Sequence, residues 1–248
     1  MATVADPIHL SVIVPAFNEA GRIGASVARI LAYLDSRTYR SELIVVLDGG
    51  GPGSEEEIAR VAQGRRDVRV LDNGSNRGKG YSVRRGVLAS HGRFVLFADA
   101  DLSLPIEDAD RFLRQLESGA DVAIGSRAVA GASERGEQQR LRQSMSRIFN
   151  AVVRSVAVRG LRDTQCGFKA FKGEVARAIF GVQRIDGFGF DVEILRIAQS
   201  RGLRIVEVPV ACQYHPSSSV RQFRHALLML ADLTRIVWHD LRGHYDVL

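Results

Sequence analysis

The sequence contains few cysteines and no long apolar run, and each absence excludes a class of protein. Only two cysteines, Cys166 and Cys212, occur in 248 residues. Two thiols so far apart form neither a disulfide framework nor a zinc cluster, so a reducing compartment is expected. No apolar stretch approaches the roughly 20 residues of a membrane-spanning helix, and residues 1–7 lack the features of a signal peptide. We therefore expect a cytoplasmic protein that is soluble or attached peripherally to the inner face of a membrane.

Acidic residues are outnumbered, and common nucleotide-binding fingerprints are absent. The chain has 34 Lys and Arg residues against 28 Asp and Glu, a net charge of +6. This balance favours anionic partners such as nucleotides, phospholipids or nucleic acid. The basic residues are scattered and no aromatic-rich RNA-binding motif accompanies them, so no nucleic-acid partner is expected. The glycines after Asp48 match neither a Walker loop nor a dinucleotide fingerprint.

Short apolar runs alternate with amphipathic helical patterns along the first half of the chain. Strands that are apolar on both faces and separated by helices form a mostly parallel sheet covered on both sides. Because no repeat and no linker divides the chain, we predict a single α/β domain. We expect strands at 10–14, 43–47, 68–71, 94–98, 121–125 and 203–210, and helices that include 23–34, 81–90, 106–116, 141–158, 190–200 and 220–241.

Two carboxylates, Asp99 and Asp101, end the fourth predicted strand. Ligands of such sheets bind beyond the carboxyl ends of the strands. Unpaired charges at a buried strand end are costly, and a hard divalent cation held by oxygen ligands removes that cost. A helix-capping role would explain Asp101 but not Asp99. The pair therefore predicts a site for a divalent metal or a nucleotide.

Three further segments follow predicted strands, and each has two interpretations. Pro15 cannot continue a parallel ladder, so Asn18 and Glu19 lie at the mouth of the fold, although both residues also suit a helix N-terminus. Asp48 can accept a hydrogen bond from a base or ribose, or can simply begin a flexible glycine turn. Residues 76–80, with Arg, Lys and two glycines before a helix, suit a phosphate or form an ordinary basic turn.

Together these segments resemble glycosyltransferase family 2, whose members have the GT-A fold. The matching segments in the first half are 12–19 (VIVPAFNE), 76–80 (NRGKG) and 99–103 (DADLS). In the second half, 163–171 (DTQCGFKAF) and 189–195 (GFDVEIL) resemble the branch that contains dolichyl-phosphate β-glucosyltransferases and other polyprenyl-phosphate glycosyltransferases. The resemblance covers nearly the whole chain.

The resemblance implies a reaction and a set of residue roles. It implies an inverting enzyme that moves glucose from UDP-glucose to a polyprenyl or dolichyl phosphate, with Mg²⁺ or Mn²⁺. It assigns catalytic roles to Asp99, Asp101 and Asp163, with Asp101 and Asp99 as metal ligands. It places the donor against Pro15, Phe17, Glu19, Asp48, Lys79, Asp99, Ala100 and Arg127, and the acceptor phosphate against Asp163 and Lys169. Arg221 and His215 are further candidates for contact with the acceptor.

The chain departs from the family pattern at two places. Family members usually have two consecutive Asp residues after the second strand, followed by Gly-Ser. Here Leu47 takes the first Asp position and Gly50 the Ser position, so the base and sugar of the donor stay open. The branch often has a Gly-Ser-Lys-Val loop before the last helix. Here residues 217–220 read Ser-Ser-Ser-Val, and we expect Arg221 to supply the missing charge.

Two other functions remain open on the sequence. A family 2 enzyme can instead use a soluble glycan or metabolite as acceptor, and a nucleotide-sugar-binding protein can have little turnover. The catalytic domain is expected to span residues 8–217. Residues 218–248 are expected to form an amphipathic helix, packed on the domain or lying at a membrane surface.

Overall fold

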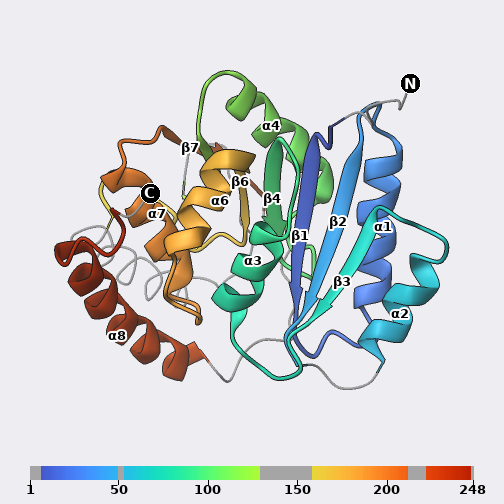
Figure 1. The fold of residues 1–248 in the computed structure, drawn as a ribbon, viewed down its shortest axis with the longest axis horizontal. Coiled ribbons are helices and arrows are strands. Elements are labelled where there is room, and N and C mark those ends of the chain that lie inside the picture. Colours follow the sequence, from blue (N-terminus) through green and yellow to red (C-terminus); the bar gives the residue numbers. More distant parts are fainter. Residues whose placement is uncertain (1–6, 50–52, 129–157, 212–221, 247–248) are drawn as a thin grey trace, which may run out of the picture.

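The computed structural model describes residues 7–49, 53–128, 158–211 and 222–246 (Figure 1). In this part of the chain, seven strands form one sheet in the order β3-β2-β1-β4-β6-β5-β7, which confirms the predicted α/β class. The strands are β1 Leu10–Ala16, β2 Ser41–Leu47, β3 Val68–Asp72, β4 Phe94–Ala98, β5 Val122–Ser126, β6 Phe168–Lys172 and β7 Ile205–Pro209. The helices are α1 Ile23–Asp35, α2 Ser54–Val61, α3 Lys79–Leu88, η1 Ile106–Asp108, α4 Ala109–Glu117, α6 Gly173–Val182, α7 Phe190–Ser200 and α8 Gln222–Leu241.

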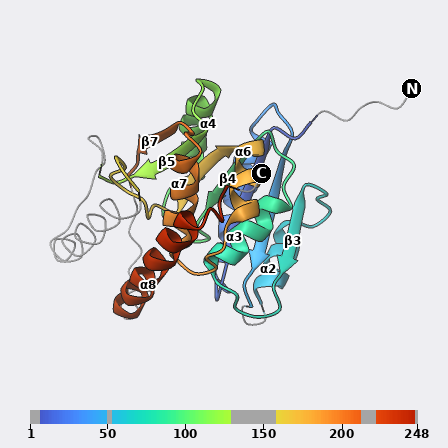
Figure 2. The ribbon, with the colours of Figure 1, turned by 60° about the vertical axis from the view of Figure 1, so that its left-hand side comes forward.

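Helices cover both faces of the sheet. Helices α1, α2 and α4 lie on one face and α3, α6 and α7 on the other, with α8 beside α7 (Figure 2). From α8 and the turn after it, Leu233, Ile236 and Tyr245 are buried in the core of the second face. Among the described helices, none is long and apolar enough to cross a membrane. The predicted helix 141–158 lies almost wholly outside the described residues, as does the expected boundary at 217–218.

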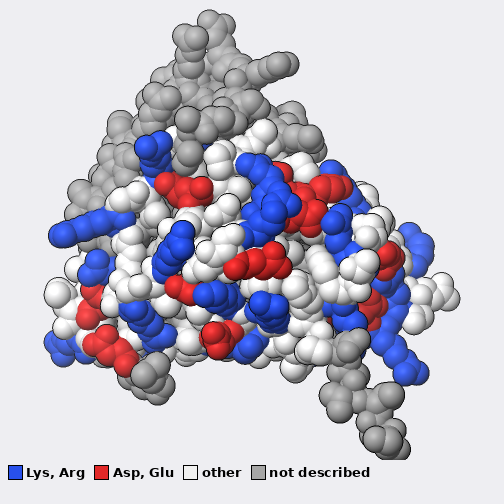
Figure 3. Space-filling model, turned by 90° about the horizontal axis from the view of Figure 1, so that it is seen from above, with Lys and Arg blue, Asp and Glu red and all other residues white. Residues whose placement is uncertain are grey.

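Charged side chains of both signs are mixed on the end of the molecule where β1 begins. Seen from above the view of Figure 1, Lys and Arg side chains alternate with Asp and Glu across the described surface (Figure 3). The carboxyl ends of the parallel strands lie at the opposite end of the sheet. Any site that the strand ends build is therefore separate from this face.

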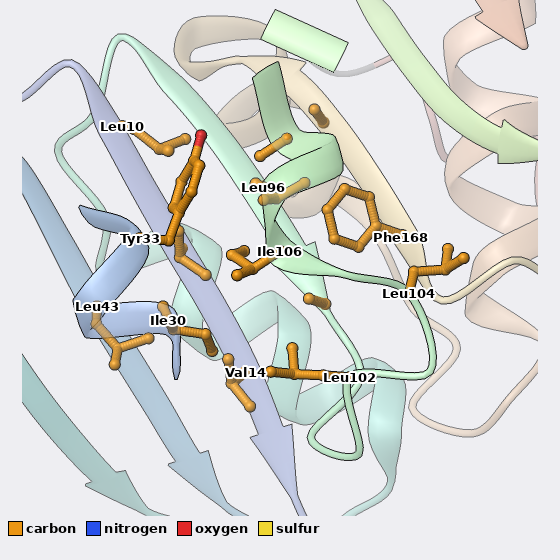
Figure 4. Packing of buried hydrophobic residues seen from close by; sticks show 14 of the residues in the cluster. Leu10, Val14, Ile30, Tyr33, Leu43, Leu96, Leu102, Leu104, Ile106 and Phe168 are labelled. Carbon is orange, nitrogen blue, oxygen red and sulfur yellow. The ribbon is translucent and has the colours of Figure 1, made fainter. Parts of the chain in front are cut away.

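The central strands are buried on both sides because they are apolar at consecutive positions. In β1, Leu10 and Val14 pack toward α1, whereas Ile13 packs toward the other layer. Figure 4 shows Ile30 and Tyr33 of α1 meeting Ile106 and Phe168 over the sheet, with the other labelled side chains around them. Such two-sided burial is what the continuous apolar runs predict.

Strand β6 and helix α6 were not predicted. β6 runs antiparallel between β4 and β5, in the middle of an otherwise parallel sheet. Its sequence, FKAFK, contains two lysines and so does not read as a buried strand. Lys169 is nevertheless fully buried, because a carboxylate from α7 neutralises it. The strands β4 and β5 are thus joined through β6, whose burial depends on the Lys169–Asp191 ion pair, and the spacing of apolar residues in the sequence does not reveal this pair.

Candidate active site

The carboxyl ends of β2, β1 and β4 lie side by side and form one edge of the sheet. These strands are parallel neighbours in the sheet order, so the residues that follow them converge. A cleft of about 570 Å³ opens there, and we call it the strand-end cleft. It is lined by Pro15, Ala16, Phe17, Glu19, Asp48, Asn76, Gly78, Lys79, Ser82, Asp99, Ala100, Asp101 and Phe188. The structure thus gathers every residue expected at the donor except Arg127.

Asp48 organises the base of the strand-end cleft. Its Oδ1 accepts hydrogen bonds from Asn73 Nδ2 at 2.8 Å and the Arg77 amide at 2.9 Å, and its Oδ2 accepts one from the Gly78 amide at 2.9 Å. The carboxylate is 4% exposed, so these donors replace its water. Asp48 therefore fixes the turn that leads into α3. The neighbouring Leu47 is buried in the core and does not line the cleft.

Lys79 is the first residue of α3, and its ammonium group lies 2.6 Å from Oδ1 of Asp99. Burial disfavours the charged form, but the carboxylates of Asp99 and Asp191 outweigh it and raise the pKa of Lys79. The side chain keeps 18% of its surface exposed, in the cleft. A permanent cation at a helix N-terminus is a suitable partner for a phosphate group.

Asp99 and Asp101 both line the strand-end cleft, with different partners. Asp101 Oδ1 accepts a hydrogen bond from the Ser103 amide at 2.9 Å, and the turn is completed by Leu102 at a positive φ of 46°. The described residues contain no group of three or more His, Cys, Asp or Glu side chains that could hold a metal. Two carboxylates nevertheless fit Mg²⁺ or Mn²⁺, because such ions commonly take one or two carboxylates together with substrate phosphates and water.

A smaller niche of about 110 Å³ adjoins the cleft, and Asp99 lines both. We call it the side niche. Gly167 packs so closely on Asp99 that a Cβ at this position would collide with its carboxylate. The Asp99 amide also donates to the Gly167 carbonyl at 3.2 Å. The niche is lined by Asp99, Leu102, Ser103, Leu104, Arg127, Gln165, Cys166, Gly167 and Phe168.

Arg127 and Asp163 form a two-pronged ion pair beside the side niche. Arg127 Nε donates to Asp163 Oδ2 at 2.7 Å and Nη2 donates to Oδ1 at 3.1 Å, while the amides of Arg127 and Gln165 also donate to this carboxylate. Burial raises the pKa of Asp163, but Arg127 outweighs burial and holds the pKa below its usual range. Both carboxylate oxygens of Asp163 thus orient Arg127 and the chain that follows the end of β5.

The structure corrects the expected place of Lys169. The family resemblance puts this side chain against the acceptor, but its exposed fraction is 0% and its ammonium group pairs with the buried Asp191. It also donates to the Cys166 carbonyl at 2.7 Å. Lys169 therefore stabilises the Cys166–Gly167 turn by its hydrogen bond to the Cys166 carbonyl, and its buried side chain is not accessible to an acceptor. The other two expected acceptor residues, His215 and Arg221, lie outside the described residues.

Sequence reasoning missed three residues of this region. Phe188, 45% exposed, reaches the strand-end cleft from the segment before α7. Asp191 supplies the buried counter-charge for Lys169, and Ser82 lines the cleft from α3. For Phe188 the available signal was an aromatic residue between two glycines, 187 and 189, which only indicates a loop.

Comparison with known proteins identifies this fold and site as those of a glycosyltransferase. Residues 11–180 match the family model described as Glycosyl transferase family 2, and the chain belongs to that family. Proteins named "Dolichyl-phosphate beta-glucosyltransferase" are 37% identical in Drosophila melanogaster, over 97% of this chain and 78% of theirs, and 34% identical in Homo sapiens, over 95% and 76%.

Solved structures show the same fold at lower sequence identity. Glucosyl-3-phosphoglycerate synthase from Mycobacterium tuberculosis, in complex with Mg²⁺ and uridine diphosphate, superimposes with a TM-score of 0.67 at 18% identity. The match covers 93% of this chain and 79% of that one. The GT-A fold expected from the sequence is thereby confirmed.

Proposed function

We propose that this chain transfers glucose from UDP-glucose to dolichyl or polyprenyl phosphate, with inversion at the anomeric carbon and with Mg²⁺ or Mn²⁺. The observation that carries the proposal is the lining of the strand-end cleft. The ammonium group of Lys79 and the carboxylates of Asp99 and Asp101 share this lining with the exposed ring of Phe17. The names of relatives that are 34–37% identical over nearly the whole chain support the donor sugar and the acceptor.

The cleft offers separate surfaces to the parts of a nucleotide sugar. Phe17, 37% exposed beside Pro15, offers an apolar surface for the base. Asp48 holds the turn whose last residues line the cleft, and Lys79 presents its ammonium group to the diphosphate. Arg127 lines the side niche next to Asp99, where a sugar attached to the diphosphate would lie. The donor thus spans the cleft from Phe17 to the niche.

Charge stabilisation of the leaving group falls to residues at the end of β4. Asp99 and Asp101 would hold Mg²⁺ or Mn²⁺, which supplies Lewis-acid stabilisation of the departing diphosphate. Lys79 adds a fixed positive charge that needs no reorganisation during the reaction. Because Lys79 and Asp99 already pair at 2.6 Å, the protein keeps both groups placed before the donor arrives.

The acceptor needs little activation by the protein. A phosphate monoester is already anionic near neutral pH, so no strong general base is required, and positioning supplies most of the rate gain. Inversion follows when the phosphate oxygen attacks the anomeric carbon opposite the leaving diphosphate, through an oxocarbenium-like state. A lipid acceptor also places the enzyme at a membrane surface, as a peripheral protein.

A product assay tests the proposal directly. Purified protein is incubated with Mg²⁺ or Mn²⁺, dolichyl phosphate in vesicles, and radiolabelled UDP-glucose, GDP-mannose or UDP-N-acetylglucosamine in parallel. We expect label from UDP-glucose in the organic phase, and loss of that label in the presence of a chelator. Donor binding without any lipid-linked product would contradict the proposal and favour a soluble acceptor or a binding protein with little turnover.

A further inference from the structure

We propose that Glu193 and Tyr245 are positioning residues of the strand-end cleft, acting through the segment 183–189. This segment, here the cleft-wall loop, joins α6 to α7 and carries Phe188 into the lining of the cleft. The inference rests on the proposed function only in taking the cleft as the donor site. It makes the C-terminal end of the chain part of the donor-binding machinery.

The cleft-wall loop lies directly on the first turn of α3. A Cβ at Gly78 would collide with the Asp186 carbonyl, and one at Gly80 with the Ile185 carbonyl. The Tyr81 amide donates to the Asp186 carbonyl at 3.1 Å. Since backbone meets backbone here, a shift of the loop moves the turn that carries Lys79.

Two side-chain bridges reinforce this contact. Gln183 Nε2 donates to the Gly80 carbonyl at 3.1 Å and to the Ile185 carbonyl at 2.8 Å. Arg84 pairs with Asp186 at 2.9 Å and donates to the Gln183 carbonyl at 3.0 Å. The loop and α3 therefore behave as one unit on the wall of the cleft.

Glu193, in α7, fixes the other side of the cleft-wall loop. Its carboxylate is fully buried, and its two oxygens accept hydrogen bonds from the amides of Arg184 at 2.9 Å and Ile185 at 2.8 Å. An unpaired carboxylate in this position would be costly, so its geometry is tightly defined by the donors around it. Glu193 thus sets where the loop backbone lies.

The C-terminal end of the chain completes the arrangement. Tyr245, after α8, is 1% exposed, and its hydroxyl donates to Glu193 Oε1 at 2.8 Å. Asp232 of α8 packs on Gly189, where a Cβ would lie 2.6 Å from the Asp232 Cβ. Helix α8 therefore contacts the cleft-wall loop directly through Asp232, and the turn after α8 contacts it indirectly, through the hydrogen bond from Tyr245 to Glu193. Loss of the Tyr245 hydroxyl leaves one oxygen of Glu193 with a donor fewer and loosens the loop.

The experiment compares Tyr245→Phe and Glu193→Gln with Ile236→Val, which shortens a buried side chain of α8 but leaves the hydrogen bonds of Glu193 in place. Amide hydrogen exchange is measured without ligand on peptides that cover 183–189 and 76–81. We expect the exchange rate of these peptides to rise about tenfold in both test variants. This rise should exceed any rise in Ile236→Val, compared at a matched melting temperature. Equal exchange in test variants and control would overturn the inference.

A second readout asks whether the loop matters for binding. Affinity is measured by calorimetry for UDP, GDP and ADP with Mn²⁺, using whichever the wild type binds most tightly. We expect Tyr245→Phe and Phe188→Ala to weaken it about fivefold, on the scale of one lost contact, with Ile236→Val unchanged. Wild-type affinity in Tyr245→Phe or in Phe188→Ala would overturn the inference. A wild type that binds no UDP refutes the proposed donor, while the exchange result still decides the role of Glu193.

Discussion

Asp101 and Asp99 are held differently although both line the strand-end cleft. Asp99 pairs with Lys79, whereas Asp101 accepts a hydrogen bond from the Ser103 amide. Asn at position 101 keeps that acceptor oxygen and removes the charge. Because we propose that Asp101 holds the divalent metal, we expect Asp101→Asn to lose about 100-fold in Mn²⁺-dependent UDP affinity. The melting temperature should be unchanged, since the turn is kept.

The matched control for this change is Asp108→Asn, which removes an acidic charge from η1 outside the cleft. Calorimetry with and without Mn²⁺ measures both variants. Full affinity for UDP in Asp101→Asn would refute the proposed metal-binding role of Asp101.

Cys166 lines the side niche, and the burial of its thiol disfavours a nucleophilic role. It is 3% exposed, and burial raises the pKa of its thiol to about 12. At about pH 8 only roughly one thiol in ten thousand is then ionised, and the thiolate is the reactive form. In a Cys212→Ser background we expect a thiol reagent to label the folded protein very slowly and the urea-unfolded protein at once. Rapid labelling of the folded protein would contradict this placement.

The Lys169–Asp191 ion pair joins β6 to α7 in the interior. Both side chains are at most 3% exposed, so removing one leaves the other buried without its ion-pair partner. We expect Lys169→Met to lower the free energy of unfolding by about 3–5 kcal/mol, and Lys169→Met with Asp191→Leu to recover most of it. Urea unfolding measures this.

Lys172 provides the comparison within the same strand. Its pair with Asp121 is partly exposed, so Lys172→Met should cost less than about 1 kcal/mol. Equal losses for the two lysine variants would mean that Lys169 is not isolated from water.

The pair of Asp163 and Arg127 links the end of β5 to the segment before β6 and predicts a pH dependence. Because the pKa of Asp163 is lowered in the folded protein, the pair stabilises the fold above the unfolded value of about 3.9. This contribution is lost as the pH falls through the lowered pKa. We expect the stability difference between wild type and Asp163→Asn to shrink below about pH 4 in urea titrations. A constant difference would refute the pairing.

The part of the element pattern that sequence predicted is the part set by local apolar runs. Strands such as β1 and β4 are buried along their whole length, so a run of apolar residues suffices to identify them. β6 carries Lys169, whose buried partner Asp191 comes 22 residues later. The ion pair with Asp191 allows a lysine to be buried in this strand, and no local sequence pattern predicts that pair.

The candidate site divides in the same way. Asp48, Lys79 and Asp99 follow strands or open a helix, so the topology of a parallel sheet alone brings them together. Phe188 reaches the cleft on the cleft-wall loop, which Glu193 and the contacts with α3 hold in place, far from any strand end. Lys169 was misplaced because its motif position says nothing about the direction of its side chain.

The whole molecule carries a net charge of +6, which bears on the lipid acceptor. Charges of both signs are mixed on the described surface of Figure 3, so no strong attraction is expected from that face. We expect the protein to sediment with anionic vesicles in about 0.01 M salt and to be released in about 1 M salt, where charges are screened within about 3 Å. Neutral vesicles are the control, and salt-insensitive binding would point to apolar insertion instead.

The position of β6 also constrains the order in which the protein can be assembled. β5 is made before β6 but pairs with β6 and β7, and β4 meets β6 on the side away from β1. When residues up to 128 have left the ribosome, β1 to β4 and the helices on both faces have been made. The edge of β4 is then open, and β5 has no neighbouring strand. β5 gains its first neighbour once β6 has been made, and Phe188 follows β6 in the chain, so one wall of the strand-end cleft is completed only after most of the chain has been synthesised.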